Sequence, residues 1–300
     1  MPDGSGLVVY EWRARQGYLA ESLFPAATFL SARPDDRAEM VLDAIPALTT
    51  HFLFHLGATI TSGFPSSRGE LLAALAAKGI QAINDRVSDI SKPFIQRTLA
   101  ALSLPSVLAD RTLPLDTPVI VKTSLNFDGK TERELPPAEL QRMGMHLARH
   151  VSGPSAYKIV RAASVPPQLW DDPSLCIERY ISNDDNRWHR AIIWKDRLVL
   201  VEGINRYRIK KLATNVESRS FYCTLTEGRY RASAGTSPRI ERVLAQLAVF
   251  VPAFGLQFGA IDVVSSNSDE PYIIDVNTTP YFLVKAADVL EHLGGALPRD

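Results

Sequence analysis

The sequence predicts an α+β fold in which a small N-terminal α/β lobe precedes a larger, strand-rich α+β region. The first observation is an alternation of patterns: an apolar run from His51 to Leu56, helical spacing from Arg68 to Lys78, and a further apolar run from Ile80 to Asn84. Such strand–helix–strand alternation is typical of a small α/β unit. The second observation is that short β-type runs dominate the second half of the chain. The boundary between the N-terminal lobe and the larger region is therefore expected near residue 90.

Each element follows from hydrophobic spacing and from the residues that begin or end it. Gly79, for example, is a good stop for the helix before it. Helices are expected at Arg68 to Lys78, Lys92 to Leu102, Pro137 to His150 and Pro238 to Phe254. Strands are expected at Leu7 to Trp12, Ala27 to Ala32, His51 to Leu56, Ile80 to Asn84, Pro118 to Lys122, Leu175 to Ile181, Ala191 to Lys195, Arg197 to Glu202, Phe221 to Leu225, Phe258 to Val264 and Tyr272 to Val276.

The composition is that of an ordinary globular protein. The 300 residues are 46% hydrophobic and 22% charged, and the formal net charge is zero, so neither a nucleic-acid nor a membrane partner is expected. No apolar run approaches the ~20 residues that span a bilayer. There is no leader pattern, and Cys176 and Cys223 are expected to be buried free thiols, so we expect a cytoplasmic protein. A homodimer is the default expectation for its assembly.

The most informative stretch is a C-terminal hairpin, GAIDVVSSNSDEPYIIDVNTTPYF, which covers residues 259–282. Asp275 and Asn277 are two residues apart, so they share a face of their strand, and Asp262 of the preceding strand joins them if the strands pair antiparallel. Three oxygen ligands on one face suit a hard cation such as Mg²⁺. The alternative, solvated acids on an outer face, requires these apolar strands to be exposed.

Two lysines and one strand end are candidates for nucleotide contacts. Lys122 ends the apolar strand PVIVK and Lys92 begins an apolar helix, which are good places for a phosphate-binding charge. The segment CIERYI, residues 176–181, runs into the polar stretch 182–186 and offers backbone groups to a flat base. Taken singly, each lysine is more often a solvated surface residue, and such a segment is more often an ordinary strand and turn.

The order of these motifs resembles the ATP-grasp superfamily, in particular the D-alanine–D-alanine ligase and ribosomal-protein glutamate ligase branches. Lys92 lies thirteen residues before Pro105, as at the family's entry to the ATP lobe. PVIVKTSLNFDGK, residues 118–130, resembles the family's phosphate-facing lysine and flexible loop, and IIDVNTTPYF, residues 273–282, resembles its metal-binding Glu-x-Asn motif. DNRWHRAIIWKDRLVLVEGINRYR, residues 185–208, resembles the strand pair of the glutamate-ligase branch.

The resemblance covers residues 80–285 and implies an ATP-grasp fold with two α+β subdomains that clasp ATP. It implies a pre-ATP-grasp lobe at 1–90 and an ATP-grasp domain at 91–300, with the lid subdomain at 91–175 and the metal-binding subdomain at 176–300. ATP and Mg²⁺ are the implied cofactors. The implied nucleotide-binding residues are Lys92, Lys122, Glu178, Tyr180, Ile181 and Asp185, and the implied metal ligands are Asp262, Asp275 and Asn277.

The sequence also departs from the family's pattern. Asp275 stands where Glu is usual, Gly129 is alone in a loop that is normally glycine-rich, and Tyr281 replaces a glycine. The place of an arginine in the D-alanine ligase branch is taken by Ala260. The positive charge that this arginine would provide can come instead from the arginines of residues 185–208, which are Arg187, Arg190, Arg206 and Arg208. A solvated strand face explains these arginines equally well.

The implied activity is ATP-dependent ligation of a small carboxylate, such as an amino acid or peptide, to an amine through an acyl phosphate. Arg187 and Arg206 are the expected catalytic residues because they occupy the positions that resemble the glutamate-ligase branch. Two alternatives stay open: an ATP-grasp kinase, which would form a stable phosphoester, and a nucleotide-binding module without catalysis. The sequence names neither substrate, and nothing in residues 1–80 has a pattern that indicates their chemistry.

Overall fold

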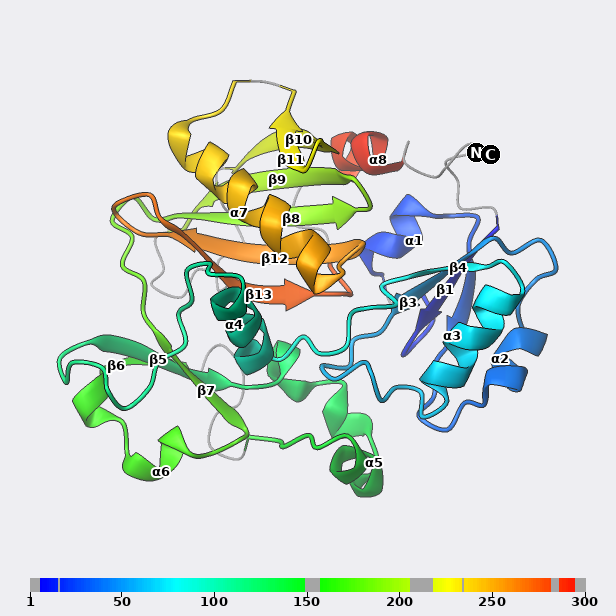
Figure 1. The fold of residues 1–300 in the computed structure, drawn as a ribbon, viewed down its shortest axis with the longest axis horizontal. Helices are drawn as coiled ribbons and strands as arrows, with labels where there is room; N and C mark the ends of the chain where they lie inside the picture. Colours follow the sequence, from blue (N-terminus) through cyan, green and yellow to red (C-terminus); the bar gives the residue numbers. More distant parts are fainter. Residues whose placement is uncertain are drawn as a thin grey trace.

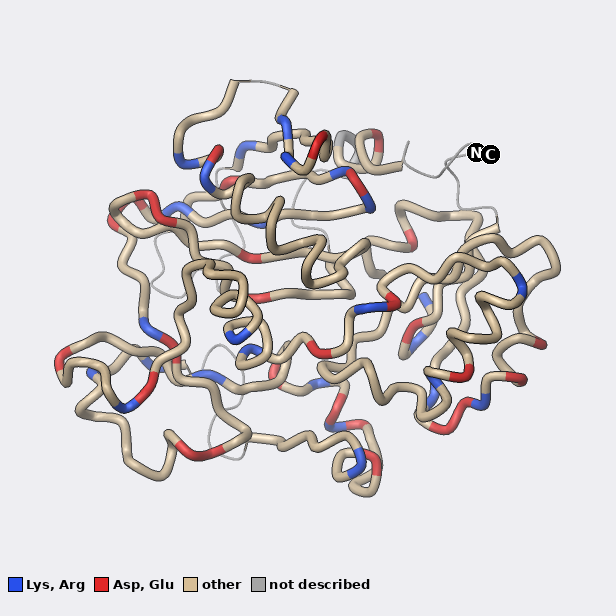
Figure 2. The backbone as a smooth tube through the Cα atoms, viewed as in Figure 1, with Lys and Arg blue, Asp and Glu red and all other residues tan. Residues whose placement is uncertain are grey.

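The computed structural model describes residues 6–15, 17–148, 157–205, 218–233, 235–281 and 286–294. Three sheets organise the described chain (Figure 1): a parallel sheet near the N-terminus, a large antiparallel sheet, and a small antiparallel sheet. Charges of both signs are scattered over all three parts, as the zero net charge leads one to expect (Figure 2). No described helix combines the length and apolar character needed to cross a membrane.

The N-terminal lobe contains a parallel sheet in the order β2-β1-β3-β4. Its elements are β1 (Leu7–Glu11), α1 (Leu19–Leu23), β2 (Thr28–Ser31), α2 (Ala38–Asp43), β3 (His51–His55), α3 (Arg68–Ala77) and β4 (Gln81–Ile83). Alternate residues of β1 point to opposite faces. Val8 and Tyr10 join a core with Leu71 and Leu75 of α3. The other face packs directly on the large sheet and on α1.

The large sheet has the strand order β11-β10-β9-β8-β12-β13. Its strands are β8 (Arg187–Trp194), β9 (Arg197–Ile204), β10 (Ser218–Thr226), β11 (Arg229–Ala232), β12 (Phe258–Ser265) and β13 (Pro271–Asn277). The long helix α7 (Pro238–Phe254) and the helix α4 (Lys92–Ala101) share one core with this sheet. The helix α8 (Ala286–Gly294) contributes Val289 and Leu293 to the core on its other face.

The small sheet has the strand order β6-β5-β7. Its strands are β5 (Pro118–Thr123), β6 (Lys158–Arg161) and β7 (Leu175–Arg179), and the short helix α6 (Pro167–Trp170) packs beside β7. Because β7 begins at Leu175, the expected subdomain boundary at 175/176 falls at the start of a strand of the small sheet. The helix α4, in turn, packs on β13 of the large sheet.

The chain between β5 and β6 leaves the small sheet and packs against the N-terminal lobe. It contains short 3₁₀ turns at Asn126–Gly129 and Glu132–Glu134 and the helix α5 (Pro137–Arg142). Leu135, Met143 and Met145 are buried in the core of the N-terminal lobe. The expected helix to His150 is shorter in the structure because Gly144 adopts a left-handed conformation with φ 64° and the Met145 N–H bonds back to the Leu140 carbonyl.

Candidate nucleotide-binding site

A cavity of about 330 Å³ lies between the small sheet and the large sheet. A volume of this size is within the range of small-molecule sites. One wall comes from β5, β7 and the start of α4, and the other comes from β8, β12 and β13. The predicted residues that line it are Lys92, Lys122, Glu178, Tyr180, Ile181, Asp262, Asp275 and Asn277.

The two predicted phosphate-binding lysines line the same wall. Lys122 of β5 and Glu178 of β7 share a face of the small sheet, because Lys122 lies opposite Cys176 and Glu178 lies opposite Ile120. The Lys122 ammonium contacts the Glu178 carboxylate at 2.5 Å, and Glu178 is only 1% exposed. Lys92 follows Ser91, whose hydroxyl caps α4, and its ammonium donates to the carbonyl oxygen of Leu125 at 2.8 Å. Both ammonium groups are therefore held by oxygen atoms.

The acidic wall is formed by the hairpin β12–β13. The strands pair antiparallel, with Asp262 opposite Asp275 and Ala260 opposite Asn277, so the three predicted ligands share one face. The register shifts between Asp262 and Val263, where a bulge bends the strand beside the acids. The side-chain oxygen of Asn277 accepts the Thr279 N–H at 2.8 Å. The sequence-based expectation of a common face is confirmed.

The strand β8 brings Arg190 into this wall. Arg190 lies directly opposite Asp262, and its guanidinium donates two hydrogen bonds to that carboxylate, at 2.7 and 3.1 Å. Burial lowers the pKa of Arg190, but the negative charges of Asp262 and Asp275 outweigh burial and leave that pKa raised. A charged guanidinium therefore lies among the acids.

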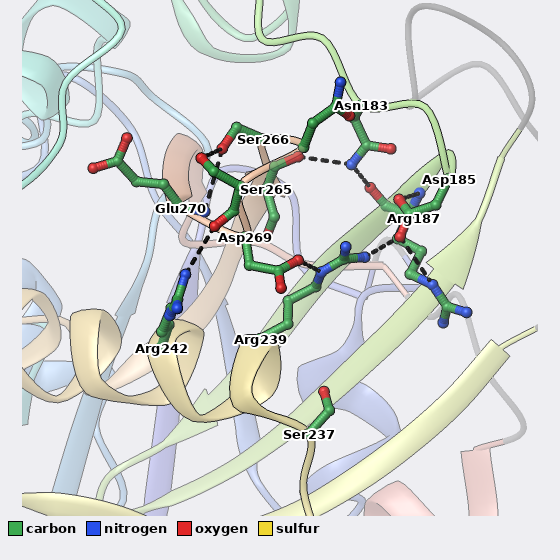
Figure 3. Close-up of polar contacts among 12 residues, drawn as sticks. Asn183, Asp185, Arg187, Ser237, Arg239, Arg242, Ser265, Ser266, Asp269 and Glu270 are labelled. Atoms are coloured by element: carbon green, nitrogen blue, oxygen red, sulfur yellow. Dashed lines mark hydrogen bonds and ion pairs between the residues drawn. The ribbon is translucent and has the colours of Figure 1, made fainter.

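Asp185 and Arg187 lie elsewhere, in a separate set of ion pairs that we call the Arg239 cluster (Figure 3). Its members are Asp185, Arg187, Glu202, Arg239 and Asp269. Arg239 of α7 binds both Asp185 and Asp269, and Arg187 contacts Glu202 at 2.8 Å. Burial raises the pKa of Asp185, but its bonds to Arg239 and Arg187 outweigh burial and leave the pKa lowered. Neither Asp185 nor Arg187 lines the cavity, and Arg206 and Arg208 lie outside the described residues.

Sequence reasoning did not single out Asn183, which also lines the cavity. Its side-chain nitrogen donates to the carbonyl oxygens of Arg187 and Ser265, both at 2.8 Å. These bonds attach the chain that follows β7 to the large sheet. The polar stretch 182–186 pointed to this region, but its sequence alone did not show which of its residues faces the cavity.

The acidic wall carries oxygen atoms of the kind that could hold a hard cation. Asp262, Asp275 and Asn277 provide two carboxylates and one amide oxygen, the ligand types that a hard cation prefers. In the described part of the chain no group of three or more His, Cys, Asp or Glu side chains is placed to hold a metal ion. Asp262, Asp275 and Asn277 could hold a cation only together with further ligands, and Arg190 would have to release Asp262 for that carboxylate to take part.

The fold is that of ATP-grasp proteins. No family model and no curated protein matches the sequence. Among solved structures, the chain resembles the ATP-grasp ligase PsnB complexed with a minimal precursor, with a TM-score of 0.53 and 11% identity over 96% of this chain and 98% of that one. It also resembles N5-carboxyaminoimidazole synthetase from Staphylococcus aureus complexed with ADP, with a TM-score of 0.50 and 12% identity over 97% and 71% of the two chains. The fold expected from the sequence is confirmed.

Proposed function

We propose that this protein is an ATP-dependent ligase that activates a small carboxylate as an acyl phosphate and transfers the acyl group to an amine. The observation that carries the proposal is the lining of the cavity. Lys92 and Lys122 lie on one wall, and Asp262, Asp275 and Asn277 lie on the other wall together with Arg190. The fold supports it, since one structural neighbour is an ATP-grasp ligase and another was crystallised with ADP.

The proposed nucleotide contacts follow the two walls. Lys92 and Lys122 bind the phosphates, and the chain from Glu178 to Ile181 lies along the adenine. Asp262, Asp275 and Asn277 hold Mg²⁺, which when bound neutralises charge on the phosphates. Phosphoryl transfer depends on positioning and charge neutralisation, so these contacts supply most of what the reaction needs.

The proposed chemistry has two steps. A carboxylate oxygen attacks the γ-phosphorus, the bond to the β-phosphate oxygen breaks, and ADP leaves with an acyl phosphate in the cavity. An amine then attacks the acyl carbon, phosphate leaves, and the nitrogen releases a proton. Arg190 is the group placed to bind the carboxylate and then the acyl phosphate, because its two-pronged guanidinium matches both anions. The loop Leu125 to Lys130 excludes water while the acyl phosphate exists.

The test is to trap the acyl phosphate. Hydroxylamine converts an acyl phosphate into a hydroxamate and leaves a phosphoester unchanged. Purified protein with Mg·ATP, hydroxylamine and a panel of amino acids and other small carboxylates is expected to give hydroxamate and ADP in equal amounts for at least one carboxylate. A stable phosphoester without hydroxamate would instead establish a kinase, and ATP binding without turnover across the panel would establish a nucleotide-binding module.

A further inference from the structure

A second cavity, of about 470 Å³, lies beside strand β7 and is distinct from the nucleotide cavity. Successive residues of a strand point to opposite faces, so Glu178 lines the nucleotide cavity while Ile177 lines the second one. We call this second space the rear cavity. Its walls are the first half of α4, the chain that follows β5, the residues that follow α5, and the chain from α6 into β7. No described residue lines both cavities.

Most of the wall of the rear cavity is apolar. Met145, Leu169, Trp170 and Ile177 are among the side chains that line it. Its volume is about three times the ~150 Å³ of a cavity that holds benzene, and it falls within the range of small-molecule sites. A ligand of this cavity therefore needs an apolar body.

The charged groups of the lining differ in how far their bonds are already made. Asp171 pairs with Arg111, and Asp172 accepts two hydrogen bonds from its own turn. Arg97 is exposed at the second turn of α4, and its guanidinium makes no hydrogen bond or ion pair with another described residue. His146 would add to the positive charge if it were protonated. The unused group is therefore a cation, which favours an anionic head group on the ligand.

The rear cavity also contacts the two segments that hold Lys92. Ser91 and Pro93, the neighbours of Lys92, line it, and so do Ser124 and Leu125. The Lys92 N–H donates to the Ser124 carbonyl at 3.0 Å, and the Lys92 ammonium donates to the Leu125 carbonyl at 2.8 Å. Ser124 is only 5% exposed, and its hydroxyl has no hydrogen-bond partner among the described residues. A ligand packed on these segments therefore bears on the position of the Lys92 ammonium in the nucleotide cavity.

We infer that the rear cavity binds an apolar monocarboxylate, such as a medium-chain or an aromatic acid, and that this ligand is an effector of nucleotide binding. Arg97 binds the carboxylate at the mouth, and the apolar walls cover the tail. An occupied cavity holds the segments around Lys92 in the arrangement described, so the acid tightens nucleotide binding by reducing the cost of ordering them. The inference goes beyond the ligase proposal, and its coupling needs only that nucleotide occupies the cavity lined by Lys92.

Calorimetry tests the site. The full chain, saturated with Mg²⁺ and a non-hydrolysable ATP analogue so that the nucleotide cavity is filled, is titrated with octanoate, 3-phenylpropionate, butyrate, octanol and octylamine. Octanoate or 3-phenylpropionate is expected to bind at least ten-fold more tightly than butyrate, which lacks the apolar body. The same acid should bind at least three-fold more tightly than octanol or octylamine, which lack the negative charge.

The contribution of Arg97 is measured by substitution. Arg97→Gln should weaken binding of the acid at least three-fold and leave octanol within two-fold, a difference that misfolding would not imitate. Arg242→Gln, which removes an exposed arginine from α7, is the matched control and should leave both ligands unchanged.

The coupling is measured by repeating the titration without the analogue. The analogue should tighten the acid at least three-fold, and the acid should tighten the analogue by the same factor. The inference is overturned if neither acid binds, if octanol or octylamine binds as tightly, if the Arg97 and Arg242 variants behave alike, or if the analogue displaces the acid or fails to tighten it. A chain that binds no analogue would overturn the nucleotide-binding proposal together with the coupling, whereas analogue binding without acid binding would overturn the rear cavity alone.

Discussion

Two groups of ion pairs in this molecule are alike in composition and differ in burial. Around the cavity, Lys122 pairs with Glu178 and Arg190 with Asp262, and these side chains are 1–17% exposed. In the Arg239 cluster, the side chains of Asp185 and Arg187 are 40% and 37% exposed, although those of Arg239 and Glu202 are 17% and 13% exposed. Water therefore screens the pair of Asp185 and Arg187, while the cavity pairs are shielded. The resemblance to the glutamate-ligase branch pointed to Arg187, whereas burial beside a cavity points to Arg190.

The largest effect that this comparison predicts concerns Asp275. Asp275→Ala should lower Mg²⁺-dependent ATP turnover on the order of 100-fold or more, because it removes a proposed ligand of the Mg²⁺ that offsets the charge of the phosphates. Turnover is measured as ADP release at saturating ATP. Asp185→Ala removes the same group from the Arg239 cluster and should retain most of the activity. Equal losses in the two variants would show that the cavity acids have no special role.

The second prediction compares the two arginines. Arg190→Lys should lower hydroxamate formation on the order of 100-fold, because an ammonium cannot bind two oxygens side by side. Arg187→Lys should change it less than about three-fold, since an exposed pair contributes little. Lysine is preferred to alanine at both positions because it leaves no buried acid without a cation. A larger loss in the Arg187 variant would return the catalytic assignment to the Arg239 cluster.

The third prediction concerns the nucleotide. Lys122→Ala should weaken ATP binding by about 1.5–3 kcal/mol, the range for a hydrogen bond to a charged group. Adenosine should be affected less, because it has no phosphate for Lys122 to meet. Titration calorimetry with both ligands measures the difference. The double variant with Glu178→Gln controls for the carboxylate that Lys122 leaves behind, and equal losses for ATP and adenosine in that background would place Lys122 away from phosphate.

The smallest effect concerns a buried acid that belongs to neither group. Glu132 is fully buried and accepts the Thr59 N–H, while its other oxygen has no hydrogen-bond partner. Burial raises the pKa of Glu132 above its ordinary value. The folded state therefore binds the proton more tightly than the unfolded state, and this contribution to stability is lost as the pH rises through the raised pKa.

Glu132→Gln keeps an acceptor for Thr59 and removes the charge. At pH 7 the variant should be more stable than the unaltered protein, by about 1 kcal/mol on the scale of single buried polar groups. The advantage should shrink as the pH falls and the native Glu132 becomes protonated. Urea unfolding at several pH values measures both trends. A variant that is less stable at pH 7 would show that the charge of Glu132 is itself stabilising, through its attraction to Lys92.

Local features of this molecule were predictable from the sequence, and contacts between distant strands were not. The face shared by Asp275 and Asn277 follows from the two-residue period of a strand. The position of Lys92 was predictable because this residue begins a helix. The position of Arg190 depends on the pairing of β8 with β12, more than 70 residues away in sequence. No short-range pattern reports which of two nearby arginines lies opposite Asp262.

A small pocket beside the N-terminal lobe, lined by Trp12, Arg13, Gly57, Lys130 and Glu134, was unpredictable for the same reason. It combines residues that follow β1 and β3 with Lys130 and Glu134 from the segment between β5 and β6. That segment was expected to continue as a helix to His150, and the left-handed Gly144 ends the helix early. Its contact with the N-terminal lobe depends on the burial of Leu135 and Met143, which only the assembled core reveals.

The segment between β5 and β6 ties the large cavity to the N-terminal lobe. Its residues 126–128 line that cavity, and Leu135 anchors the segment in the core of the N-terminal lobe. If a ligand of the cavity displaces this segment, the displacement must also strain or reorganise that core. Such coupling is reciprocal: whatever stabilises the packing of the segment on the lobe favours the state of the cavity that goes with it by the same factor.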